Sequence, residues 1–382
     1  MFQSKKTVIS FCVLLVLMLA AGLTASGQGN KLSTSPNFEN FISNDDQNYN
    51  FWHSISQRAA SEAWNLMGDK PSDMIVLTNA GYAVIDNCTT EAGLDGLMEA
   101  TGCTAGRSNL LRVQTARNQP LWYFFYDTNT GKGVYCEFDS EKTVQNMDKS
   151  IRQIPADTLF SKLVMEQVNA ESLFNNPEEW NEKLAEDIFN GNEFRIVNIT
   201  NAIAKGAPFD LVNCMLFHDH YCPGVTSGYL LANYLEKNFP LRAGESYYVI
   251  STPIWCKDDA LQVLLNTTPG KRGMAVLPLS TEMRENLKPE AESLAGIYFR
   301  HNSRAQEGQG ILLGFNWPEE LSREGFGWEW RLEWNLWLLD NLEKPEMFVD
   351  VINTFELEED ETPDIYAHTG VNVLEILDLL DD

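Results

Sequence analysis

The sequence has little positive charge, few cysteines and only five histidines. Its 382 residues include 28 Lys and Arg against 54 Asp and Glu, which gives a formal net charge of −26. A nucleic-acid-binding protein normally carries a basic face, so this balance argues against nucleic acid as a partner. It also disfavours docking on anionic lipid. Seven cysteines are too few for a disulfide scaffold at this length, but they are enough for one metal site.

Long apolar runs are also scarce, and the one that occurs lies near the N-terminus. Lys5 and Lys6 precede an apolar run over residues 8–25, and small and polar residues 26–28 follow. This order of basic, apolar and small residues is typical of an export signal. We therefore predict a signal peptide or an N-terminal anchor over residues 1–27. The protein is then expected outside the cell, either secreted or tethered to the membrane by this segment.

One order of structural elements occurs twice along the rest of the chain. After a flexible lead-in over residues 28–50, residues 51–140 contain a helix-like segment, a strand-like run, a second helix and further strand-like runs. Residues 211–345 repeat this order of helix, strand, helix and three strands. Such internal similarity indicates a duplicated domain. Strands that come in runs after helices favour an α+β fold with a mixed sheet in each copy.

The remaining segments have simpler patterns. Residues 141–210, including 159–168, place apolar side chains at three- and four-residue spacing, which predicts a helical connector. A helix rich in Trp and Leu is expected over residues 327–342, packed on the second sheet. The acidic residues 346–382 are typical of a solvated C-terminal tail.

The densest group of metal-binding residue types is in the segment 217–224, FHDHYCPG. His218, His220 and Cys222 alternate along it, and an extended segment would point all three side chains to one side. Two imidazoles and a thiolate suit zinc or iron. Cys256, at the head of a predicted helix, could supply a fourth ligand, because a helix N-terminus favours the thiolate.

The same residues allow two other interpretations. Cys222 and Cys256 could instead form a disulfide in a purely structural module. Alternatively, three ligands could bind the metal and leave one position for water or substrate, as in a metal-dependent hydrolase or redox enzyme. The catalytic candidates are then Asp259 and Gln262, one helical turn apart. Asp259 would act as a base or as a group that orients a ligand.

These motifs resemble those of the FmdE family, a family of domains named for the operon of formylmethanofuran dehydrogenase. Its pattern F-H-G-H-x-C-P-G corresponds to residues 217–224, C-x-x-D-A-x-Q to 256–262, and the end of T-G-C-T-x-G-K to 268–271. The resemblance implies an α+β domain with a bound metal. The positions that bind this metal correspond to His218, His220, Cys222 and Cys256.

The chain departs from the family pattern at several positions. Asp219 replaces the usual Gly, and Thr267 replaces the Cys of T-G-C-T. The first copy keeps T-G-C-T-x-G at residues 101–106, but it has no H-x-H-x-C run. We expect this copy to be degenerate, either structural or a donor of Cys103 or His53 to a shared cleft. No C-x-x-C pair occurs, so the zinc finger of some family members is absent.

The resemblance and the export signal together give an expected function. We expect an exported protein that binds a transition metal, zinc or else iron, or a metallocofactor, through its H-x-H-x-C…C set. A metal-dependent enzyme is one alternative. An accessory subunit of formylmethanofuran dehydrogenase is another, although that chemistry is cytoplasmic. An archaeal source would fit the family. The two copies are expected to form an internal pseudo-dimer, and the oligomeric state is left open.

Overall fold

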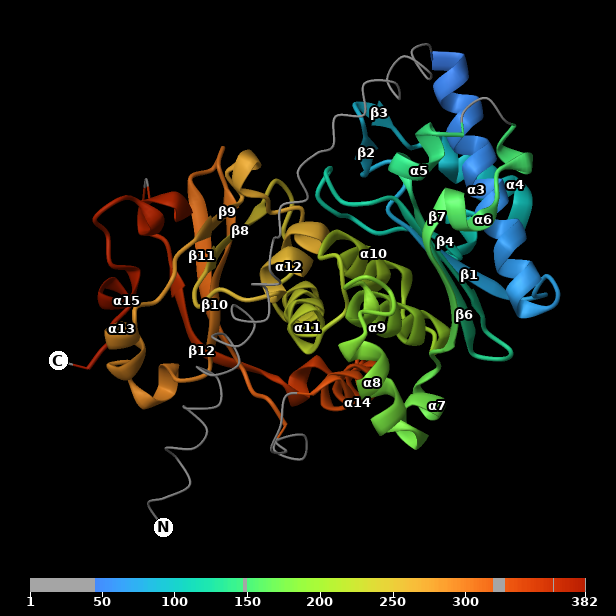
Figure 1. Cartoon of the computed structure of the whole chain (residues 1–382). Helices are drawn as coiled ribbons and strands as arrows, with labels where there is room; N and C mark the ends of the chain where they lie inside the picture. Colours follow the sequence, from blue (N-terminus) through green and yellow to red (C-terminus); the bar gives the residue numbers. More distant parts are fainter. Residues whose placement is uncertain (1–44, 147–149, 319–326, 360, 382) are drawn as a thin grey trace. The chain divides into compact units, whose positions relative to one another are not determined.

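The computed structural model describes four stretches of the chain, drawn in colour in Figure 1: residues 45–146, 150–318, 327–359 and 361–381. The signal or anchor predicted over residues 1–27 lies outside them, as does most of the lead-in over 28–50. Among the described helices, none is both long and apolar enough to cross a membrane.

The described chain divides into two compact units. One unit runs from residue 45 to residue 222 and also includes residues 327–339. The other begins at residue 223 and contains the remaining described residues of the C-terminal half.

The first unit is built on a five-stranded sheet in the order β4-β1-β5-β6-β7. The strands are β1 (Met74–Thr78), β4 (Leu110–Arg112), β5 (Trp122–Asp127), β6 (Lys132–Phe138) and β7 (Phe160–Gln167). β1 and β4 pair in parallel and the other neighbours pair antiparallel, so the sheet is mixed. A separate two-stranded ribbon consists of β2 (Val84–Ile85) and β3 (Cys88–Thr89).

Helices cover this sheet on both faces. The helices of the first unit are α3 (Asp45–Met67), α4 (Ala92–Thr101), α5 (Ser140–Val144), α6 (Ala156–Leu159), α7 (Ala170–Asn175), α8 (Pro177–Ala185), α9 (Glu193–Ala204), α10 (Phe209–Phe217) and α14 (Trp328–Leu339). Trp52 of α3 and Leu97 of α4 share one buried cluster with Phe125 of the sheet. The neighbouring Phe124 points to the other face, because side chains alternate along a strand. There its ring contacts Phe189, with centroids 5.6 Å apart.

Two segments of the first unit differ from the sequence-based expectation. The segment 159–168 was predicted as helix, but its residues 160–167 form strand β7, which pairs with β6 along almost its full length. The unpaired edge of β6 offers this segment backbone hydrogen bonds that outweigh its weak helical spacing. The Trp- and Leu-rich helix α14 was expected on the second sheet, but it belongs to the first unit and packs on α9.

The second unit has a five-stranded mixed sheet in the order β9-β8-β10-β11-β12. Its strands are β8 (Ser246–Ser251), β9 (Met274–Val276), β10 (Leu294–Asn302), β11 (Glu307–Phe315) and β12 (Val349–Glu356). Its helices are α11 (Pro223–Asn238), α12 (Lys257–Leu265), α13 (Thr281–Glu285) and α15 (Val373–Ile376). β8 and β9 are parallel and the other pairs are antiparallel, as in the first unit.

The end of the chain is part of this second fold, so the expectation of a solvated tail over residues 346–382 was wrong. β12 is one of the two edge strands of the sheet and pairs with β11. Tyr366, Val373 and Leu374 are buried in one cluster with Phe299 of β10. The apolar residues among the acidic ones provide enough hydrophobic area to cover a face of the sheet.

The predicted α+β class with two copies of one domain is confirmed. Both copies run helix, strand, helix and then strands, and both sheets connect these strands in the same order. Each copy has four strands after its second helix instead of the predicted three. The additional strands are β7 and β12, which lie at the sheet edge and come from the segments expected as connector and tail.

Candidate metal centre

The H-x-H-x-C run begins where α10 ends, and it forms a turn. His218 caps the helix with its N–H donating to the carbonyl of Cys214 at 2.9 Å. Asp219 then adopts a left-handed backbone with φ of 71°. Glycine accepts this conformation most easily and Asp is among the side chains that tolerate it best. Asp219 can therefore stand where the family pattern has Gly. The predicted extended form of the run was wrong.

This turn brings the ring of His220 against that of His218, with centroids 4.3 Å apart. The ligand atoms of His218, His220 and Cys222 lie within 4.8 Å of one another, so they could hold one metal ion. Cys222 is 4% exposed, and the two histidines are half-buried. Three of the four predicted ligands, all in the first unit, therefore form one cluster.

Asp219 holds one of these histidines in place. Its Oδ1 lies 2.7 Å from Nδ1 of His220, and its Oδ2 accepts a hydrogen bond from Nη2 of Arg195 at 2.8 Å. Burial opposes ionisation, but the hydrogen bond from His220 and the Arg195 charge prevail and lower the pKa of Asp219 to about 2. An ionised carboxylate only accepts hydrogen bonds, so Nδ1 of His220 donates. This leaves Nε2 as the nitrogen for a metal, the arrangement common in metal sites.

The backbone between His220 and Cys222 is fixed by buried amides. Asn335 of α14 donates one hydrogen bond to the carbonyl of Tyr221 at 3.0 Å and another to Oδ1 of Asn198 at 2.7 Å. The Tyr221 hydroxyl donates to the backbone carbonyl of Asn335 at 3.3 Å. Sequence reasoning missed Asn335, because an Asn in an apolar helix more than 100 residues away gives no local signal.

Cys256 is in the second unit, where it precedes α12 and packs against the start of α11. A Cβ added to Gly224 would lie 2.9 Å from Cβ of Cys256 and 3.3 Å from its Sγ. Only a glycine at this position lets the thiol come so close. Gly224 is two residues beyond Cys222 in the chain, and this gives the C-P-G end of the motif a structural reason.

Buried hydrogen bonds also fix the segment that carries Cys256. Lys257 is fully buried, and its Nζ donates to Oγ of Ser251 at 3.1 Å, to the carbonyl of Pro253 at 2.9 Å and to Oδ1 of Asp258 at 2.6 Å. Desolvation lowers the pKa of Lys257, while the Asp258 carboxylate counteracts it. The lysine ties the loop after β8 to the first turn of α12.

The other candidate residues have partners of their own. Gln262 donates to Oδ1 of Asp259 at 3.3 Å, one turn away on α12. In the first copy, His53 Nε2 lies 2.9 Å from Glu99, and the buried Cys103 donates weakly to the carbonyl of Met74 at 3.6 Å. Burial raises the pKa of the Cys103 thiol. Within the described residues, the structure therefore gives His53 and Cys103 roles inside their own copy. It pairs none of the six cysteines it describes in a disulfide.

Comparison with known protein families shows a match to the family described as FmdE, Molybdenum formylmethanofuran dehydrogenase operon. It covers residues 52–190 and 217–324, which is well over half of the chain and includes both copies. The chain belongs to the FmdE family. The prediction of a duplicated FmdE-like chain is thereby confirmed. No curated protein matches this FmdE chain.

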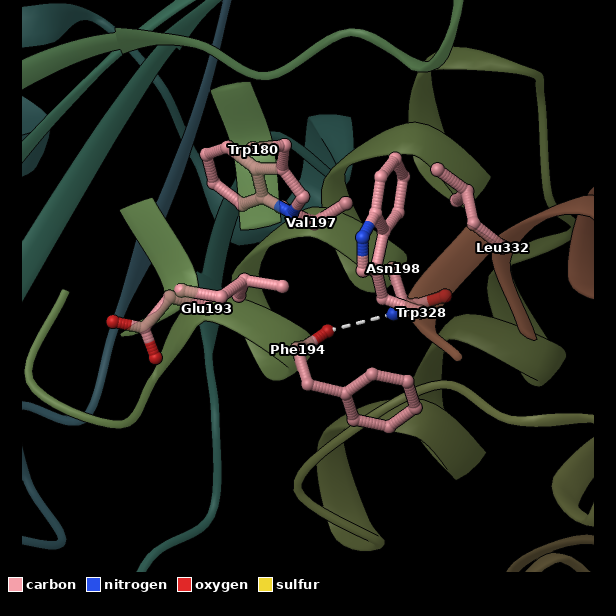
Figure 2. A pocket seen from close by; sticks show the side chains of 8 residues that line it. Trp180, Glu193, Phe194, Val197, Asn198, Trp328 and Leu332 are labelled. Carbon is pink, nitrogen blue, oxygen red and sulfur yellow. Dashed lines mark hydrogen bonds between the residues drawn. The ribbon is translucent and has the colours of Figure 1, made fainter. Parts of the chain in front are cut away.

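The first unit of this FmdE chain has a small, mainly apolar pocket, and one of its lining residues contacts His220. Trp180, Val197 and Trp328 line it together with Phe194 (Figure 2). The Phe194 backbone is held by a hydrogen bond from the side chain of Asn198 to its carbonyl at 2.9 Å. The Phe194 ring also packs on the imidazole of His220, with centroids 5.2 Å apart. One aromatic ring thus contacts both the pocket and a candidate ligand.

Proposed function

We propose that this FmdE-family protein binds a single transition-metal ion through His218, His220, Cys222 and Cys256. The observation that carries the proposal is the close approach of the first three ligand atoms, within 4.8 Å of one another, at a turn that Asp219 braces. Cys256 is proposed as the fourth ligand because its side chain packs on Gly224, just beyond Cys222.

The donor set indicates the kind of metal. Two imidazoles and two thiolates suit zinc best, with iron second, whereas calcium and magnesium prefer oxygen ligands. Four protein ligands around zinc form a closed tetrahedral site, which stabilises or stores the metal rather than activating water. Metal binding, rather than catalysis, is therefore the function we favour.

The proposed site of action is outside the cytoplasm. The basic, apolar and small-residue order of residues 1–27 supports export, with secretion or a membrane tether as its two forms. Thiolate ligands in such a compartment face oxidation. Bound metal would protect Cys222 and Cys256 from pairing, because coordinated thiolates are not available for exchange.

Metal analysis of the purified chain tests this proposal. Protein produced in metal-replete medium should contain about one metal ion per chain, measured by elemental analysis. His218→Ala and Cys222→Ser should each lose it. Cys136→Ser is the matched control, because Cys136 is buried like Cys222 but its thiol donates to the carbonyl of Ala59 in the first copy. A metal-free wild type, or equal metal in all variants, would contradict the proposal.

A metal-dependent enzyme is the second candidate, and the pocket beside Phe194 is the observation in its favour. It would use an open coordination position, with Asp259 and Gln262 as catalytic candidates. Cobalt substituted for the native metal discriminates the two. A closed four-ligand site should keep its visible spectrum when azide or cyanide is added. An open site should bind the anion and change its spectrum.

A further inference from the structure

We propose that the first copy, which lacks the H-x-H-x-C run, positions the metal ligand His220 through a hydrogen-bond relay that starts in the buried sheet and ends at the partly exposed Asp219. The relay runs from Glu137 and Tyr135 on β6, through Asn192 and Arg195 of the α9 region, to Asp219 and His220. All six residues lie in the first unit. The inference rests on the proposed metal site and assigns Arg195 as a positioning residue for it.

Arg195 clamps the turn at Asp219 from two directions. Its Nη2 donates to the carboxylate Oδ2 at 2.8 Å, and its Nε donates to the backbone carbonyl of the same residue at 2.9 Å. The planar guanidinium fixes both groups in one plane, which a lysine could not do. The other carboxylate oxygen then accepts the hydrogen bond from His220 at 2.7 Å. The orientation of Arg195 therefore sets the orientation of the imidazole.

Arg195 is itself held by an amide at the start of α9. Its Nη1 donates to Oδ1 of Asn192. The amide nitrogen of Asn192 donates to the Tyr135 hydroxyl and to the carbonyl of Phe189, both at 3.1 Å. Asn192 is buried, so its amide has exchanged water for these protein partners. A buried amide whose donors and acceptor are satisfied has one orientation only.

The relay begins in the sheet of the first copy. The Tyr135 hydroxyl donates to Oε2 of Glu137 at 2.8 Å, and Tyr135 is fully buried. The Glu137 carboxylate also accepts hydrogen bonds from Oγ of Ser161 at 2.9 Å and from the amide of Asn190 at 2.9 and 3.0 Å. Desolvation raises the pKa of Tyr135 well above its usual range, so its hydroxyl stays a donor.

The direction of every bond is consistent with a single arrangement. Glu137 accepts from Tyr135, Asn192 donates to Tyr135 and accepts from Arg195, and Asp219 accepts from both Arg195 and His220. The relay depends on Asp219, because the glycine of the family pattern has no side chain to accept either bond. It also gives the first copy a role that does not need metal ligands of its own.

The test measures affinity for cobalt and zinc ions in the full chain by competition with a chromophoric chelator. Arg195→Ala should weaken binding by about 10–100-fold, the usual effect of losing an outer partner of a metal-bound histidine. Arg195→Lys should recover only part of this, because it restores charge without the fork. Tyr135→Phe removes one hydroxyl and should weaken binding by a smaller factor. The visible spectrum of bound cobalt should shift in Arg195→Ala, because the geometry at His220 changes.

Arg58→Ala is the matched control. The Arg58 side chain is 19% exposed against 20% for Arg195, and it also pairs with a carboxylate and with backbone carbonyls of its own unit. It takes no part in the relay. Arg58→Ala should leave both the cobalt spectrum and the affinity unchanged, even if it lowers the unfolding temperature as much.

A double-mutant cycle separates the relay from general destabilisation. Asp219→Gly suits the left-handed backbone there and removes the acceptor. If Arg195 acts mainly through the Asp219 carboxylate, Arg195→Ala should have a much smaller effect on affinity in this background, where only the hydrogen bond to the backbone carbonyl of residue 219 remains to be lost. An undiminished effect would overturn the relay, as would an Arg195→Ala variant that binds metal as the wild type does. A wild type without metal affinity overturns the proposed function itself.

Discussion

The two copies of the FmdE domain share their framework but differ at the start of their helices. Both second helices end in a left-handed residue, Gly102 in one copy and Asn266 in the other. Each is followed by a short 3-10 turn, Ala105–Arg107 or Pro269–Lys271, that also ends left-handed. The two copies differ in the side chains that their first and second helices bury against each other.

In each copy the first and second helices, α3 and α4 or α11 and α12, pack closely at a glycine. This glycine is on the second helix in the first copy and on the first helix in the second copy. In the first copy, a Cβ added to Gly96 of α4 would lie 2.2 Å from Oγ of Ser56. In the second, a Cβ added to Gly228 of α11 would lie 2.8 Å from Cβ of Ala260. Gly96 and Ala260 both stand six residues before the left-handed cap, so they correspond. Ser56 then corresponds to Gly228.

This correspondence explains why only one copy has a thiol at this place. Four residues before Ser56 and Gly228 stand Trp52 and Gly224, and ten residues before the two caps stand Ala92 and Cys256. In the first copy the large side chain, Trp52, is on the first helix and the small one, Ala92, is on the second. In the second copy the first helix has Gly224 and the larger Cys256 precedes the second helix. Trp52 is fully buried and packs edge-on against Phe138, with centroids 5.2 Å apart. One copy uses the position for its hydrophobic core, and the other uses it for a candidate ligand.

The largest loss of stability is expected from removing the buried Trp52 side chain of the first copy. Trp52→Ala should lower the free energy of unfolding by about 3–5 kcal/mol, because it leaves a large cavity. Chemical denaturation measures this loss. Metal content should not change under conditions where the variant is folded. Loss of metal from a folded Trp52→Ala chain would show that the two positions do not have separate roles.

The second prediction adds a side-chain atom at the corresponding position of the second copy, Gly224. Gly224→Ala places a Cβ against Cys256 and should cost about 1–3 kcal/mol, the usual range for overpacking. Metal affinity should also fall, because the thiol must move, and chelator competition measures this. Gly270→Ala is the control, since a Cβ there meets no described atom within 4 Å. Equal affinity in both variants would count against Cys256 as a ligand.

The sequence predicts the repeated parts of this molecule well because their signals are local. Apolar periodicity and the T-x-G turns at residues 104–106 and 268–270 identify two α+β copies. The family motif identifies the cluster around His220. Strand β7 was not predictable, because its conformation depends on pairing with β6 rather than on its own apolar spacing. The roles of Arg195 and Asn335 were missed for a similar reason, since their partners lie elsewhere in the chain.

The left-handed caps allow a smaller test of the shared framework. Gly102→Ala should cost about 1–2 kcal/mol, because the left-handed backbone strains any residue with a Cβ. There is no steric clash to add, since a Cβ at Gly102 meets no described atom within 4 Å. Asn266→Gly should change stability by only a few tenths of a kcal/mol, as Asn tolerates this conformation. Thermal unfolding of the two variants measures these losses of stability. Equal losses in Gly102→Ala and Asn266→Gly would argue against the correspondence of the two left-handed caps.

The smallest expected effect is a pH dependence that arises at Asp219. Its pKa of about 2 lies below the ordinary value near 3.9 in an unfolded chain, so ionised Asp219 stabilises the fold above that ordinary value. The contribution disappears as the pH falls from about 4 to about 2. Because the side chain is 39% exposed, solvent screening should reduce it to about 1 kcal/mol or less.

Asp219→Asn should therefore destabilise the metal-free protein at neutral pH, and the difference from wild type should vanish near pH 2. Denaturation at several pH values, with a chelator present, measures this difference. Asp69→Asn, at an exposed position of the first copy, should show no comparable change. A constant difference down to pH 2 would mean that Asp219 acts through its shape and hydrogen bonds alone. If the stability difference between Asp219→Asn and wild type vanishes near pH 2, the charge of Asp219 stabilises the turn that carries the histidines. The corresponding region of the first copy is stabilised by the buried Trp52 instead and needs no such charge.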